Sequence, residues 1–291
     1  MSDLLDGRRP VAKVPRPDIV RAFAREPGLT AVGLAGLAVA SVCLVAVAVR
    51  GPSIAPEGKP LDAVTFTFGV GIFMLTMALV LPLAGWSDDA RRRCRRCFYI
   101  FAIYGLAVES VQAFRGLDPR FSDAGGPIDV AVGAVFGVTA LIMTAATVVL
   151  GCRFFRADVL ADRPVLRLGI RYGVAAVLLS FAIGILMSAL SGRTTGTAGN
   201  LLPAHALGVH GIQAMPIAAL LITGAPGVRK PAASVHVAGV GWLLACAGAL
   251  AQALAGLAPS APSACSVLVV GGLAAWIVAT GQPWVSSVRR R

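Results

Sequence analysis

Charged residues are scarce in this sequence of 291 residues. Aspartate, glutamate, lysine and arginine together make up 14% of the chain, whereas a soluble domain is nearer to a quarter charged. Hydrophobic residues make up 57%. The composition therefore excludes an ordinary soluble globular protein.

Other absences limit the chemistry. The three lysines, Lys13, Lys59 and Lys230, all lie outside the long apolar stretches, which excludes a retinal Schiff base. No nucleotide-binding loop, nucleophile motif or complete set of metal ligands is visible, so no enzyme class is indicated. Cys94 and Cys97 have C-x-x-C spacing, but a zinc or redox site needs further ligands or a thioredoxin-like βαβ unit. We expect reduced, incidental thiols in a cytoplasmic loop and predict no metal site.

What the sequence does contain is a series of long apolar stretches. Each has roughly 20 residues, enough to cross about 30 Å of hydrocarbon as a helix. The eight expected spans are 29–49, 63–85, 98–114, 128–150, 168–190, 201–223, 235–256 and 263–281. The sequence therefore predicts an all-α, polytopic helical membrane bundle. Its parts are a basic amino-terminal segment (1–28), an eight-helix transmembrane domain (29–281) and a basic tail (282–291).

The basic residues alternate along the chain. They are numerous before the first span, after the last, and in the connections that follow spans 2, 4 and 6, and they are sparse in the other connections. The positive-inside rule places the basic connections and both termini in the cytoplasm. Since topology explains the net charge of +12, we predict no nucleic-acid partner. Residues 1–28 fit either a disordered tail or a short surface helix capped by Asp18, with Phe23 toward the lipid.

Polar side chains within the spans gather toward the predicted outer side of the membrane. Ionisable groups at membrane depth are rare, so they are the first candidates for a functional site. Three of the candidates follow one another at three-residue spacing on one helix face, one opens the next span, and three descend span 201–223 from outside. If these helices are neighbours, the side chains could line one outward-facing polar pocket. The seven candidate residues are Glu109, Gln112, Arg115, Asp129, His205, His210 and Gln213.

The span 201–223 constrains the cofactor. His205 and His210 are five residues apart and point about 140° from each other on an ideal helix, which makes a poor metal pair. His210 and Gln213 share a face, and Pro216 could bend the helix and leave a carbonyl facing the pocket. Haem held by two histidines needs an opposing histidine at matching depth, whereas His236 starts its span on the cytoplasmic side. Haem is therefore disfavoured, and no cofactor is assigned.

Glycine recurs within the spans. Gly133 and Gly137 have the G-x-x-x-G spacing by which membrane helices approach each other closely, and we expect helix packing there. No internal repeat and no soluble domain is evident.

Two motifs carry a resemblance. E-x-x-Q-x-x-R-G runs from Glu109 to Gly116, and H-x-x-G-x-H-x-x-Q-x-x-P runs from His205 to Pro216. Together they resemble a group of bacterial, actinobacterial-type multi-pass integral membrane proteins that have no assigned activity. The resemblance implies that the two segments belong together, but it implies no reaction. Relatives often carry Ser-His-Phe-Asn where residues 119–122 here read Pro-Arg-Phe-Ser.

Three functions fit these observations. The first is binding or translocation of a small solute or a proton. The second is a membrane-embedded enzyme or haem/redox protein in which Glu109 or a histidine acts as acid or base. The third is a structural subunit in which the polar groups are helix-packing hydrogen bonds. We favour the first, because a proline within a span and glycine-rich helices suit it. The expected location is the inner (plasma) membrane, with the lipid bilayer as partner; no oligomeric state is indicated.

Overall fold

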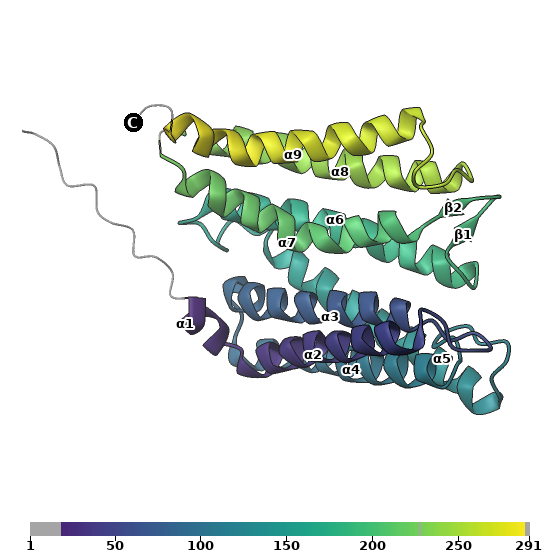
Figure 1. Cartoon of the computed structure of the whole chain (residues 1–291). Helices are drawn as coiled ribbons and strands as arrows, with labels where there is room; N and C mark the ends of the chain where they lie inside the picture. The colour runs from purple at the N-terminus through teal and green to yellow at the C-terminus, as the bar shows by residue number, and fades with distance from the viewer. Residues whose placement is uncertain (1–18, 227, 289–291) are drawn as a thin grey trace, which may run out of the picture.

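The chain folds into a bundle of long helices, seen in a computed structural model that describes residues 19–226 and 228–288 (Figure 1). Its elements are α1 (Ile19–Ala24), α2 (Pro27–Arg50), α3 (Pro60–Val80), η1 (Leu81–Ala84), α4 (Asp88–Phe114), α5 (Pro127–Arg153), α6 (Pro164–Ala189), β1 (Thr194–Thr195), β2 (Gly199–Asn200), α7 (Leu202–Gly224), α8 (Pro231–Leu254) and α9 (Ala264–Val288). Within those residues, eight helices are long and apolar enough to cross a membrane. The predicted all-α architecture with about eight spans is confirmed.

Proline opens five of the long helices, at Pro27, Pro60, Pro127, Pro164 and Pro231. It suits the first helical position because its φ angle is preset and the amide hydrogen that it lacks would have no partner there. These helices begin one to four residues before the expected apolar spans. The helical hydrogen bonding therefore extends past the apolar stretch into polar flanks.

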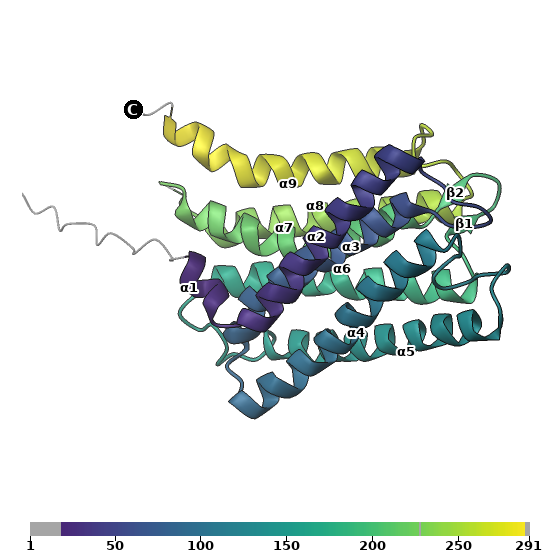
Figure 2. The ribbon, with the colours of Figure 1, turned by 60° about the horizontal axis from the view of Figure 1, so that its bottom comes forward.

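Consecutive long helices run in opposite directions (Figures 1 and 2). One end of the bundle, the termini end, holds α1 and the end of α9. The other end, the hairpin end, holds the connections 51–59, 115–126, 190–201 and 255–263, the third of which contains the β1–β2 hairpin. The described chain thus starts and finishes on the same side of the bundle, as an even number of crossings requires.

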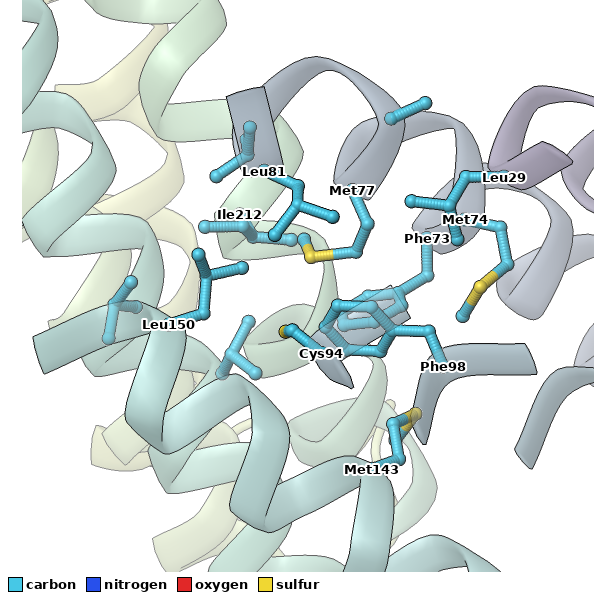
Figure 3. Packing of buried hydrophobic residues seen from close by; sticks show 14 of the residues in the cluster. Leu29, Phe73, Met74, Met77, Leu81, Cys94, Phe98, Met143, Leu150 and Ile212 are labelled. Atoms are coloured by element: carbon cyan, nitrogen blue, oxygen red, sulfur yellow. The ribbon is translucent and has the colours of Figure 1, made fainter. Parts of the chain in front are cut away.

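The bundle has two groups of four helices, α2–α5 and α6–α9 (Figure 1). Contacts between the groups are made mainly by α3 with α7 and by α5 with α6. The largest cluster of buried hydrophobic residues joins them, and Figure 3 shows Ile212 of α7 beside Met77 of α3 and Leu81 of η1. In a bilayer such contacts stabilise helix association through van der Waals packing.

The arginine-rich segment 91–96 forms the first turns of α4, which corrects the expectation of a loop. The hydroxyl oxygen of Ser87 caps the helix by accepting a hydrogen bond of 3.4 Å from the backbone N–H of Ala90. The carboxylates of Asp88 and Asp89 lie in the first turn, where they interact favourably with the positive end of the helix dipole. Asp88 also forms an ion pair with Arg91 at 3.0 Å. These local signals extend the helix ten residues before the expected apolar span.

The cysteines of this segment are therefore on a helix, where a loop was expected. Cys94 is buried, and its thiol lies 3.9 Å from the carbonyl oxygen of Ala146 in α5. Cys97 is half-buried, and all six cysteines of the chain are free.

The amino-terminal segment contains the short helix α1, and its expected cap, Asp18, lies outside the described residues. Phe23 is half-buried and packs against the main hydrophobic cluster, and its contact with lipid stays a prediction. Glu26 is fully buried between α1 and α2 and pairs with Arg91 and Arg95 of α4. These ion pairs hold the start of α2 against the amino-terminal turns of α4.

Glycines allow the closest helix contacts. A Cβ atom on Gly71 of α3 would lie 2.9 Å from the carbonyl oxygen of Gly33 in α2, so neither position has room for a side chain. The expectation for Gly133 and Gly137 is wrong. Gly137 faces open space, and a Cβ atom on Gly133 would lie 2.5 Å from the carbonyl oxygen of Arg120. Gly133 therefore makes room for a connection and not for another helix.

Candidate functional site

Glu109 is a buried carboxylate near the hairpin end of α4. Its side chain is 1% exposed, and Oε1 accepts a hydrogen bond of 2.7 Å from Nη2 of Arg120. The second oxygen, Oε2, has no hydrogen-bond partner in the part of the chain that the structure describes. Because a buried carboxylate is strongly disfavoured without a compensating charge, the guanidinium of Arg120 stabilises it.

Local hydrogen bonds place Arg120 in this position. Oδ1 of Asp118 accepts from the backbone N–H of Arg120 at 2.8 Å and of Phe121 at 2.9 Å, which fixes a tight turn. Gly133 of α5 leaves room for the backbone at the same point. The 115–126 connection therefore lies close against α5 and directs the arginine toward α4.

Glu57, in the preceding connection, holds the 115–126 connection. Its carboxylate accepts from the hydroxyl of Ser122 at 2.6 Å and from the backbone N–H groups of Asp118 at 3.3 Å and of Asp123 and Ala124 at 2.9 Å. These bonds, above all that from Ser122, lower the pKa of Glu57 below its ordinary value. This carboxylate thus joins the 51–59 and 115–126 connections, which also share a backbone hydrogen bond of 2.8 Å from the N–H of Glu57 to the carbonyl oxygen of Gly116.

Two aromatic rings lie against the guanidinium of Arg120. Its Cζ atom lies 5.8 Å from the ring centroid of Phe66 in α3 and 5.6 Å from that of Phe136 in α5. The two ring centroids are 5.6 Å apart, and both rings contact Phe101 of α4. A cation over an aromatic face is attracted by the ring quadrupole. Arg120 is therefore held by three helices at once.

Gln112, Arg115 and Asp129 form a second group beside the first. Oδ1 of Asp129 accepts from Nε2 of Gln112 at 2.9 Å and from Nη1 of Arg115 at 2.6 Å, and Arg115 also donates to Oε1 of Gln112. Oδ2 of Asp129 accepts from the backbone N–H of Gly126 and caps α5. Four of the seven predicted residues therefore lie at the corner where α4 meets α5.

The other three predicted residues lie on α7. Nδ1 of His205 is 2.9 Å from the carbonyl oxygen of Ser180 in α6 and 3.0 Å from its hydroxyl. Nδ1 of His210 is 3.3 Å from the side-chain amide of Gln213, and that amide is 3.0 Å from the hydroxyl of Thr76 in α3. His205 thus belongs to the contact between α6 and α7, and Gln213 to the contact between the two helix groups.

Among the described residues, no hydrogen bond or ion pair joins the candidates on α4 and α5 to those on α7. One pocket lined by all seven candidates stays a prediction. A cavity of about 140 Å³ between α7, α8 and α9, lined by Leu207, Gln252 and Ser266 among others, includes none of them.

Two further expectations concern α7 and haem. The helix continues through Pro216 to its end at Gly224. His236 lies near the start of α8 at the termini end, where its Nδ1 is 2.9 Å from the hydroxyl of Tyr172 in α6. Among the described residues, no group of three or more histidine, cysteine, aspartate or glutamate side chains is arranged to hold a metal ion.

Several residues of the site were not among the predicted ones: Arg120, Glu57, Ser180 and Thr76. Comparisons with known protein families, curated proteins and solved structures find no match. The functional argument therefore starts from the geometry of this site.

Proposed function

We propose that this protein is an inner (plasma) membrane protein with both termini in the cytoplasm, and that its Glu109 site binds or translocates a small solute or a proton. Most of the described arginines and lysines lie at the termini end, which supports a cytoplasmic location for that end. The hairpin end, which carries the site, then faces the outside of the cell.

The buried carboxylate of Glu109 carries the proposal. Ionisable residues at membrane depth mark binding sites and proton relays, because a purely structural role seldom offsets their desolvation. Glu109 has one free oxygen and a partner, Arg120, whose side chain is 29% exposed. The carboxylate of Glu109 is thus buried, and its partner Arg120 is the partly exposed side chain that covers it.

The neighbouring group favours a structural role. Each side chain of Gln112, Arg115 and Asp129 bonds to another member of the group, and Asp129 also caps α5. These bonds fix the angle between α4 and α5. We therefore assign binding to Glu109 and the support of its helices to these three residues.

Reconstitution of the full chain into proteoliposomes tests the proposal. Proton flux is followed with an entrapped pH-sensitive dye under an imposed membrane potential, and solute binding by calorimetry against a panel of small ions. Glu109→Gln should abolish the signal and retain the helical content. Asp123→Asn is the matched control, because it removes the same charge from an exposed residue of the adjacent connection and should keep the signal. A signal that is equal in wild type and Glu109→Gln would overturn the assignment.

A further inference from the structure

The surroundings of Arg120 have the composition of a binding site for an organic cation. Phe66 and Phe136 present ring faces at 5.8 and 5.6 Å, and Glu109 provides a buried carboxylate. Proteins recognise alkylated ammonium and guanidinium groups with aromatic faces next to a negative charge. Here the cation that occupies the site belongs to the chain itself.

The guanidinium of Arg120 bonds to only one of the two oxygens of Glu109. Arg120 donates to Oε1 of Glu109, whereas Oε2 is buried and lacks a partner among the described residues. A planar guanidinium can bridge both oxygens of a carboxylate with two parallel hydrogen bonds. A free guanidinium, which is not restrained by the 115–126 connection, can adopt that geometry.

The charge around the site also favours a cation. Asp118 lies two residues before Arg120 in the same turn, where its Oδ1 accepts from the backbone N–H of Arg120 at 2.8 Å. If the side chain of Arg120 moves out, the site keeps the negative charge of Glu109 with the carboxylate of Asp118 nearby. An anion or a neutral solute would leave that charge uncompensated.

Resting on the proposed function, we infer that the Glu109 site takes an organic monovalent cation, a guanidinium or alkylated ammonium group, which displaces Arg120 from its place beside Phe66 and Phe136. In the absence of this ligand, the guanidinium of Arg120 occupies its place. It is the exposed part of an otherwise buried pair, so an incoming cation meets it first from the hairpin end.

Calorimetric titration of the full chain in nanodiscs tests this inference, with methylguanidinium and tetramethylammonium as probes and sodium chloride at equal ionic strength as the reference. Arg120→Ala should bind the organic cations at least about tenfold more tightly than wild type, since a tethered competitor acts at millimolar effective concentration. Phe136→Leu in the Arg120→Ala background should weaken that binding, and Glu109→Gln should abolish it. Arg50→Ala is the control, because Arg50 is an exposed arginine at the hairpin end of α2, outside both groups, and its removal should leave binding unchanged.

If Arg120→Ala does not fold, Arg120→Lys serves in its place, because it retains the charge and cannot form the two-pronged guanidinium contact. It should also bind the probes more tightly than wild type. Failure of both variants to bind either probe more tightly than wild type, or undiminished binding when Glu109→Gln is added to Arg120→Ala, would overturn the inference. Glu109-dependent proton flux without organic-cation binding would contradict only this inference, whereas cation binding without flux would contradict only translocation.

Discussion

The pairing of Glu109 with Arg120 makes a quantitative prediction about stability. Arg120→Met keeps most of the side-chain stem and removes the guanidinium, so the carboxylate, which is 1% exposed, is left without its partner. Removing one member of a buried ion pair costs about 3–5 kcal/mol of the free energy of unfolding. The two cation–π contacts, each about 0.5–2 kcal/mol, are lost in the same substitution.

The double variant separates the charge effect from simple packing. Glu109→Gln alone should cost less, about 1–2 kcal/mol, because the guanidinium that it leaves is 29% exposed and stays partly hydrated. Glu109→Gln combined with Arg120→Met removes both charges and should be destabilised by only about 1–2 kcal/mol. The sum of the two single effects should therefore exceed the double effect by about 2–6 kcal/mol.

Reversible unfolding in mixed detergent micelles at neutral pH measures all three variants on one scale. Arg115→Met is the control, since its side chain is 52% exposed and its pair with Asp129 should contribute less than about 1 kcal/mol. Strictly additive effects of the two single substitutions would refute the argument, because they would mean that the buried carboxylate does not depend on the arginine.

Three further predictions concern other contacts. In the same unfolding assay, Gly71→Ala should destabilise the protein by about 1–3 kcal/mol, because the added methyl group pushes α2 away from α3. Gly137→Ala, which faces open space, should leave the stability unchanged. Thr76→Val combined with Gln213→Leu should reveal a coupling of about 0.6 kcal/mol between the helix groups in a double-mutant cycle. Because Glu57 has a lowered pKa, its contribution is present above about pH 4.3 and lost as the pH falls through the lowered value. Glu57→Gln should therefore reduce hydrogen-exchange protection of residues 118–124 at pH 7, and its difference from wild type should shrink toward pH 3.

The fold could be predicted from the sequence because the bilayer imposes one solution on each apolar stretch. A segment of roughly 20 apolar residues has to satisfy its backbone internally, and a helix is the way to do so. The ends could not be placed from hydropathy alone. The capping residue Ser87 and the prolines at positions such as Pro164 and Pro231 mark the true starts, and these are local signals that an apolar window ignores.

The site could be predicted in part. Helix periodicity places Gln112 and Arg115 on one face, and Asp129 opens the helix that follows the same connection, so the three are close in sequence as well as in space. The burial of Arg120 depends on the fold of a connection, on the space at Gly133 and on a carboxylate from another connection, none of which is periodic. Asp118, two residues before the arginine, is the one local signal, because an aspartate there predicts a turn.

The position of Arg120 against the buried Glu109 also has a consequence for how the bundle assembles. Arg120 contacts side chains from α3, α4 and α5, so it can reach its place only after all three helices are inserted and packed. The 115–126 connection brings the arginine into the bundle from the hairpin end, where α4 and α5 meet. Until then the carboxylate of Glu109 lacks its counter-charge. The Glu109–Arg120 pair can therefore form only where α3, α4 and α5 have all packed, so its presence distinguishes this packed corner from one in which a helix is missing.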